Sequence, residues 1–464
     1  MADAPIELRA DPDLKKWASL VPFGPIDQAS EQFRSELGLP TTGPIVTTGH
    51  QPTFWHPGIL AKYLAADALA DSIGAHAAWL VVDQDAVDPF AIELPIRPKN
   101  GALTAHALRL AGEVTDGHSA ASVSPARPTA IDDTIPYAID GIGTRTRAMS
   151  AALASHMNES SAARQAVHAN FDALERVLPK KPVVFASDLN RTSLFGELLV
   201  RMERDPENTV SAYNEAVRMF PDAQLTELAS SDIQYLYELP LWSITEGEPR
   251  RRVYHHDLES IDRATLVPRA LLVTAMMRLA GCELFIHGTG GAVYDQATEH
   301  WMKRWLNAKL APSVAISADL RLGLDSGTVS EQESRHARWL AHSARHNPSL
   351  IGNETAQGAK NKLVERIALA IERGENAAPL FRELHDNRRT FEFAHAMELA
   401  HLRENATILE QRAIESSVAN KRDWPAAIYA AEQLGALEAR IRSEFSPGSG
   451  VRDASKAINP SRAR

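Results

Sequence analysis

The chain has 464 residues, and its 49 Lys and Arg against 59 Asp and Glu give a formal net charge of −10. A general nucleic-acid-binding protein needs a basic face, so we expect no nucleic-acid partner. The one cysteine, Cys282, excludes an intramolecular disulfide framework and a cysteine-based zinc site. Residues 1–10 lack the pattern of a signal peptide, and the most apolar run, 270–277, is too short to cross a membrane. We therefore expect a cytoplasmic protein with no membrane partner.

The first half of the chain predicts a strand–helix–strand unit. Residues 45–48 form an apolar run typical of a buried strand, and 78–82 form a second one. Between them, a helix is predicted for 57–72, with Pro57 in its first turn, where the missing N–H group costs nothing. Two strands that are joined by a helix in this way lie parallel to each other.

Strands and helices continue to alternate up to about residue 325, and the chain is then helical. Further strands are predicted near 103–110, 182–186, 283–287 and 314–320, a hairpin turn at 246–249, and helices at 144–177, 193–204, 208–219, 269–279 and 293–310. We therefore predict an α/β protein with a parallel-sheet core at 1–327, an insertion at about 88–180, a C-terminal helical arm at 328–445 and a disordered tail at 446–464.

In an open parallel sheet, ligands bind beyond the carboxyl ends of the strands. This rule selects three loops for the candidate site, at 48–51 with 56–58, at 83–85 and at 287–291. Because the strands are predicted to be parallel, we expect the three loops to converge on one crevice.

Glycines dominate the third loop, which leads into a predicted helix. Gly288, Gly290 and Gly291 allow a ligand to approach the backbone closely, and the N–H groups at a helix N-terminus favour a phosphate or a carboxylate. Tyr294, in the first turn of that helix, is predicted to bind the same ligand. The spacing matches neither a dinucleotide fingerprint nor a Walker A loop, and a tight turn without a ligand explains the glycines nearly as well.

The first loop carries two imidazoles beside a helix start. His50 and His56 can bind an anion or shuttle protons near neutral pH, and we predict that both are catalytic. Gly49, Gln51 and Lys62 are predicted to bind the substrate, Lys62 as a point charge one turn into the helix. The alternative is that His50 only caps the helix or packs against a neighbouring aromatic ring.

Carboxylates follow two of the strands. Asp83 and Asp85 end the second strand, and if the chain stays extended they share one side and form a catalytic pair that holds or deprotonates an amine. Asp188 follows a later strand and is predicted to line the same crevice. The alternative for the pair is a capping aspartate with a solvated neighbour. We predict no metal site, because the adjacent His255 and His256 point in opposite directions in an extended segment.

These loops resemble a known family. Thr48-Gly49-His50-Gln51, the helix start at Pro57-Gly58, the acidic end of the next strand and Gly290-Gly291 with Tyr294 are similar to the bacillithiol biosynthesis cysteine-adding enzymes. The family pattern has Gln where His50 stands, and its lysine lies two residues later than Lys62. The resemblance implies a Rossmann-like core with inserted connecting segments, a C-terminal coiled coil used for homodimerisation and a nucleotide-compatible pocket.

The resemblance implies a ligase that joins cysteine to an amino-sugar compound. From the residues and the resemblance together, we predict an enzyme, ligase-like, that joins an amino acid to an amino sugar or a similar small molecule. The cofactor stays open between none and a nucleotide, with or without Mg²⁺. Two alternatives use the same residues: a nucleotidyl or phosphate-group transferase, and a catalytically silent coiled-coil protein that only dimerises.

Overall fold

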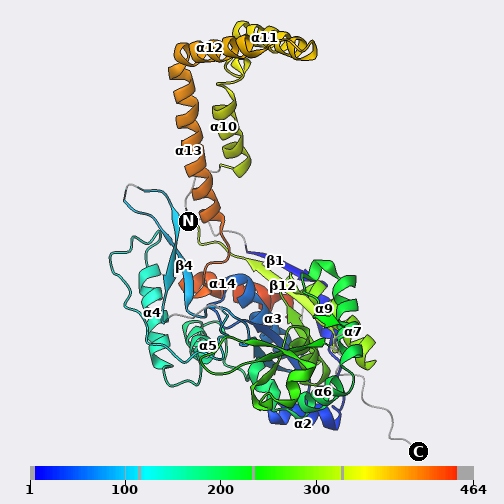
Figure 1. Ribbon diagram of the computed structural model, residues 1–464. Coiled ribbons are helices and arrows are strands. Elements are labelled where there is room, and N and C mark those ends of the chain that lie inside the picture. The colour runs from blue at the N-terminus through cyan, green and yellow to red at the C-terminus, as the bar shows by residue number, and fades with distance from the viewer. Residues whose placement is uncertain (1–5, 100, 113–116, 232–235, 325–328, 447–464) are drawn as a thin grey trace, which may run out of the picture.

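The computed structural model describes residues 6–99, 101–112, 117–231, 236–324 and 329–446 (Figure 1). Its centre is a six-stranded sheet in the order β1-β12-β11-β2-β3-β6. The strands are β1 (Glu7–Asp11), β2 (Ile45–His50), β3 (His76–Val81), β6 (Val183–Phe185), β11 (Leu284–His287) and β12 (Ser313–Asp319). All neighbours are parallel except β1, which pairs antiparallel with β12 at the edge. The predicted α/β fold with a largely parallel sheet is confirmed.

Alternating side chains divide the core into two layers, one on each face of the sheet. Val46 and Trp79 belong to one apolar cluster, whereas Ile45 and Leu80 belong to the other. The strands are therefore buried on both faces, which explains why they read as continuous apolar runs in the sequence. The first face is covered by α3 (Pro57–Ile73), α5 (Ala162–Ala173) and α14 (Ala431–Glu444). The second is covered by α2 (Gln28–Glu36) and by the helices α6 to α9, whose bounds follow below.

The remaining elements surround this core. Helices on the core are α1 (Trp17–Leu20), α4 (Ile142–Ser155), α6 (Ser193–Arg204), α7 (Pro206–Met219), α8 (Leu271–Met276) and α9 (Gly291–Leu306). A second sheet contains β7 (Ser230–Ser231), β8 (Leu236–Ser243), β9 (Arg251–Tyr254) and β10 (Leu266–Pro268), and β4 (Ala91–Ile96) pairs with β5 (Thr104–Arg109) in a ribbon. The antiparallel pairing of β8 with β9 confirms the predicted hairpin at 246–249.

Three predicted helices differ from those observed. The helix predicted at 144–177 is two helices, α4 and α5, because the chain turns at 156–161 and Ser161 caps α5 by accepting a hydrogen bond from the Arg164 N–H. The helix predicted at 269–279 is the short α8, followed by a wider turn over 277–281. The helix predicted at 293–310 starts two residues earlier and ends at Leu306, because Asn307 adopts a left-handed conformation.

The C-terminal arm consists of α10 (Glu331–Ser343), α11 (Glu354–Glu372), α12 (Ala378–Ala394) and α13 (Ala396–Asn420). α10 and α13 run side by side away from the sheet, and α11 and α12 lie across their far end (Figure 1). α14 lies outside this arm, although the arm was predicted to extend to residue 445. Its apolar side chains Leu434, Leu437 and Ile441 join the core, which leaves α3 buried on nearly all sides. Residues 447–464, where we predict a disordered tail, lie outside the described part.

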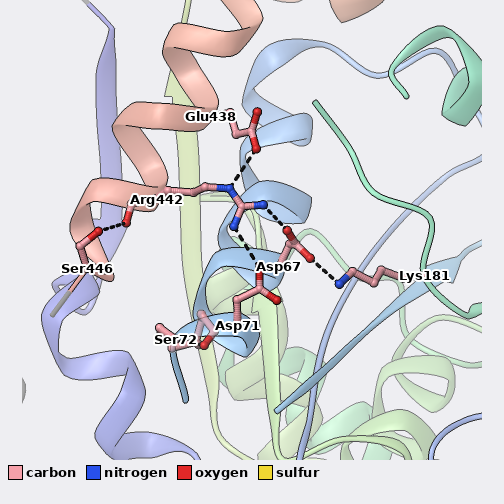
Figure 2. A network of polar contacts seen from close by, with 8 residues as sticks. Asp67, Asp71, Ser72, Lys181, Glu438, Arg442 and Ser446 are labelled. Carbon is pink, nitrogen blue, oxygen red and sulfur yellow. Dashed lines mark hydrogen bonds and ion pairs between the residues drawn. The ribbon is translucent and has the colours of Figure 1, made fainter. Parts of the chain in front are cut away.

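A network of ion pairs fixes α14 to α3 (Figure 2). Asp67 of α3 is 1% exposed, and its carboxylate lies 2.5 Å from the Arg442 guanidinium and 2.6 Å from the Lys181 amine. Arg442 also pairs with Asp71 and Glu438. A buried charge is tolerated only when it is paired, so these contacts tie the end of the described chain to the helix that leads into the candidate site.

Candidate functional site

A pocket of about 530 Å³ lies beyond the carboxyl ends of β2, β3 and β11. The three predicted loops meet there, since every predicted site residue except Asp83 and Asp188 lines the pocket. The predicted residues that line it are Gly49, His50, Gln51, His56, Lys62, Asp85, Gly288, Gly290, Gly291 and Tyr294. The parallel order of the strands causes this convergence, because it places their carboxyl ends at one edge.

Asp83 and Asp188 face other partners. The expectation that Asp83 shares a side with Asp85 is wrong, because the chain turns directly after β3 instead of staying extended. Asp83 is 1% exposed and accepts hydrogen bonds from the Ser187 N–H at 2.9 Å and the Ser187 hydroxyl at 2.5 Å. Asp188 lies 2.5 Å from the Arg164 guanidinium. Neither carboxylate lines the pocket, although both are predicted to face the same crevice as the histidines.

Lys62 lies at the bottom of the site on α3. The residue is 4% exposed, and its amine donates a 2.6 Å hydrogen bond to the Gly49 carbonyl. Burial lowers the pKa of this amine to about 7. Within the described residues no carboxylate lies within ion-pair distance of it, so nothing offsets the cost of burial and the amine loses its proton much more readily than an exposed lysine. A lysine in this state can accept a proton or bind an anion that restores its charge.

The two histidines of the first loop have different roles in the fold. His56 caps α3, since its Nδ1 accepts a 3.1 Å hydrogen bond from the Gly58 N–H. His50 does not cap the helix, and its Nδ1 is buried without a hydrogen-bond partner among the described residues. Burial and the nearby Lys62 charge hold the pKa of His50 well below its usual range, so this imidazole is neutral at pH 7. The capping alternative therefore applies to His56 and leaves His50 available to a ligand.

The glycine loop joins β11 to the N-terminus of α9. The Gly291 N–H donates to the Gly288 carbonyl at 2.8 Å and closes a turn, and a Cβ atom on Gly291 would lie 2.7 Å from His287 Nδ1. Glycine is therefore required at 291 by the fold itself. A Cβ atom on Gly290 would meet nothing within 4 Å, so packing does not require glycine there. Both residues line the pocket at the positive end of the α9 dipole, as an anion site would need.

Two buried ion pairs behind this loop, both made by Asp295, were not predicted. His287 Nε2 lies 2.7 Å from the Asp295 carboxylate, which in turn lies 3.0 Å from Arg278. Burial raises the pKa of Asp295, but the His287 and Arg278 charges outweigh it and hold the pKa below its usual range. The ionised Asp295 orients the His287 ring at the pocket wall. His287 is the last residue of β11, so the rule that selected the loop could also have selected this side chain.

Asp85 is held at the opposite wall of the pocket by two side chains. Gln51 Nε2 donates to its carboxylate at 3.3 Å, and Arg250 Nη1 donates at 3.2 Å. The Arg250 guanidinium also lies over the Trp242 ring, 4.3 Å from its centroid. Arg250 belongs to a run of three arginines at 250–252, and it positions a carboxylate of the site.

The described residues contain neither a metal-binding cluster nor a membrane-spanning helix. No group of three or more His, Cys, Asp or Glu is placed to hold a metal ion there. The described helices are all too short or too polar to cross a membrane.

Comparisons with known proteins give little further information. No family model matches the sequence, and no curated protein matches it. Among solved structures, a Campylobacter jejuni chain provisionally named an arginyl-tRNA synthetase aligns over 93% of this chain and 95% of its own length, at 12% identity and a TM-score of 0.23. A TM-score this low carries no argument about fold or function. The resemblance to the cysteine-adding enzymes therefore stays a prediction.

Gly290→Val should weaken binding of an anion without unfolding the protein. The valine side chain has room in the fold but would stand between the ligand and the N–H groups of α9. We expect the Kd for inorganic pyrophosphate, measured by calorimetry, to rise about tenfold, which corresponds to about 1.4 kcal/mol. The melting temperature should stay unchanged. Equal affinity of the variant and the wild-type protein would contradict an anion site at this loop.

Proposed function

We propose that the protein is a ligase-type enzyme that forms an amide between the carboxyl group of an amino acid and the amine of a second small molecule. One observation carries the proposal: a buried amine with a pKa of about 7, Lys62, lies in the same pocket as a neutral imidazole, His50, and a glycine loop at a helix N-terminus. Amide formation needs an anion-binding loop, because the carboxylate must be activated by a phosphate-containing group. It also needs a base such as Lys62 or His50, because the attacking ammonium must lose a proton.

The chemistry assigns a role to each part of the pocket. A nucleoside triphosphate would convert the carboxylate to an acyl-adenylate and release pyrophosphate, and the glycine loop would bind the phosphate groups. Asp85 would hold the incoming ammonium group, and Lys62 or His50 would take its proton. The amine would then form the C–N bond as the C–O bond to the AMP phosphate breaks. AMP would leave as an anion, and His56, whose pKa is lowered by burial, would shuttle the second proton of the nitrogen to water. The resemblance names cysteine as the amino acid and an amino sugar as the acceptor, and both are part of this proposal.

A nucleotidyl or phosphate-group transferase is the second candidate, because the same glycine loop and histidines suit phosphate chemistry. The experiment follows the nucleotide in incubations with ATP, Mg²⁺, cysteine or another amino acid, and a pool of amino sugars. A ligase releases AMP, pyrophosphate and amide in equal amounts, whereas a transferase leaves nucleotide or phosphate on the product. If no substrate turns over and neither His50→Ala nor Gly290→Val changes ligand binding, the protein is a silent assembly protein and both proposals fail.

The arm is proposed to mediate homodimerisation. Many of the exposed large apolar side chains lie on it, among them Trp339, Val364, Leu369, Ile371, Phe393 and Met397, the last two 88% and 87% exposed. Contiguous exposed apolar surface usually marks an interface. The two ends of the arm lie close together, since Arg321 before it contacts Asn420 at its end.

Removing the arm should therefore leave a folded monomer. A short Gly/Ser linker that replaces residues 329–418 keeps α14 on the core, because the segments that flank the arm already touch. We expect light scattering to give the mass of a dimer for the full chain and of a monomer for the variant. A dimer in the variant, or a monomer of the full chain, would rule out this role of the arm.

A further inference from the structure

The structure has a second pocket, of about 590 Å³, in the arm. The helices α11 and α12 that line it lie at the far end of the arm, away from the sheet (Figure 1). The pocket is formed by α11, α12 and the turn that follows α10. Six basic or imidazole side chains line it, namely Arg345, His346, Lys360, His385, Arg388 and His395, and no Asp or Glu lines it. The chain as a whole has a net charge of −10, so the positive charge of this pocket is opposite in sign to that of the protein.

The three permanent cations of this pocket have few negative partners. Lys360 Nζ donates to the Asn347 amide oxygen at 2.8 Å, and Arg345 Nε donates to His346 Nε2 at 2.9 Å. Both partners are neutral, since His346 must be unprotonated to accept. Arg388 Nε is buried with no hydrogen-bond acceptor among the described residues, and the nearest carboxylate, Glu392, lies 3.4 Å away. Three cations therefore face this pocket with one carboxylate, Glu392, at ion-pair distance from one of them. The excess positive charge repels itself, and a bound anion reduces this repulsion.

The floor of the same pocket is apolar. Pro348, Ala356, Leu384 and Phe391 line it, and the Phe391 ring lies 4.8 Å from the His395 ring at an angle of 38°. A simple inorganic anion would use only the basic rim and would leave this floor open to water. A flat apolar group on the same ligand would cover the floor and pack against the Phe391 ring.

We propose that the arm pocket is a binding site for a small molecule that carries both a phosphate group and a flat, apolar ring. The phosphate binds the Lys360 ammonium group and the planar guanidinium groups of Arg345 and Arg388, which can each donate two hydrogen bonds to it. The ring lies on Phe391. The arm pocket is separate from the core pocket, which is the pocket at the carboxyl ends of β2, β3 and β11. The proposal for the arm pocket therefore does not depend on the function proposed for the core pocket.

The test uses phenyl phosphate as the probe and the full-length protein in titration calorimetry. We expect phenyl phosphate to bind at least tenfold more tightly than inorganic phosphate, because only the first can cover the floor. Arg388→Gln and Lys360→Gln should each weaken binding about tenfold, equal to about 1.4 kcal/mol. Arg389→Gln is the matched control, since Arg389 is exposed on the same helix and does not line the pocket. It should leave the affinity unchanged.

The titration is repeated in Gly290→Val, which alters the core pocket and leaves the arm intact. Binding that persists in this variant and is lost in Arg388→Gln supports the arm site, whatever the outcome for the ligase. Equal affinities for phenyl phosphate and inorganic phosphate would overturn the proposal. So would equal losses in Arg388→Gln and Arg389→Gln, or binding of an RNA oligonucleotide without binding of phenyl phosphate.

Discussion

Between about pH 7 and pH 10, the wild-type protein should gain stability relative to a Lys62→Met variant. The pKa of Lys62 is about 7 in the folded protein because the amine is buried, whereas it is about 10.4 in an unfolded chain. In this window the unfolded chain binds a proton that the folded protein does not hold. Unfolding therefore takes up a proton and becomes less favourable as the pH rises.

The expected gain is about 1 kcal/mol for each pH unit in that window, measured as the difference in free energy of unfolding from urea titrations. Below pH 7 the lysine is charged in both the folded and the unfolded protein, so the cost of burying its charge is fully present. The difference in free energy of unfolding between the two proteins should then no longer change with pH. Comparing the two proteins removes the contributions of other groups such as Cys282, whose thiol pKa is raised by burial to about 12. Lys16→Met serves as the control because Lys16 is exposed, and its difference from wild type should be independent of pH.

A flat difference for Lys62→Met would mean that Lys62 remains charged in the folded protein. It would then act as a permanent cation for an anionic substrate and could not take the proton of the attacking amine. The same variant should lose turnover at every pH if Lys62 is the base. If another group is the base, the loss should appear mainly as weaker substrate binding.

The position of the site could be predicted from the sequence because buried parallel strands are continuous apolar runs. Their ends are visible at His50, Val82 and His287, and polar or glycine residues follow each one. The rule that ligands bind at the carboxyl ends of such strands needs no side-chain detail. The edge strand β1 was missed because its alternating pattern, with Glu7 and Arg9 exposed, is short and polar.

Side-chain directions at the site could not be predicted, because they depend on contacts between distant segments. Asp83 is bound by Ser187, which lies in the turn directly after β6, and Asp85 is bound by Arg250, which is far away in sequence. The end of the arm escaped prediction for a similar reason. The apolar stripe of α14 is as suitable for the core as for a coiled coil, and only its contacts with α3 decide between them.

Replacement of Asp83 by alanine should mainly lower stability, whereas replacement of Asp85 should mainly lower turnover. Asp83→Ala should lower the free energy of unfolding by about 2 kcal/mol, because it leaves the Ser187 N–H and hydroxyl without their acceptor in a buried place. Asp85→Ala should change it by less than about 1 kcal/mol, since the Asp85 side chain is 35% exposed and its partner Arg250 can be solvated. Urea titrations at pH 7 measure both values.

Turnover in the amide-forming assay should show the reverse order. Asp85→Ala removes the carboxylate that faces the pocket, and we expect a loss of about 100-fold, typical of a group that positions or deprotonates a substrate. Asp85→Asn keeps the size of the side chain but removes its charge and replaces one acceptor oxygen by an NH2 donor. An equal loss in this variant would show that the carboxylate, and not the bulk of the side chain, binds the ammonium group. Asp83→Ala should keep nearly full turnover per folded molecule. If instead Asp83→Ala abolishes turnover at unchanged stability while Asp85→Ala is active, Asp83 must turn away from Ser187 toward the substrate during the reaction, and the assignment of the two carboxylates has to be reversed.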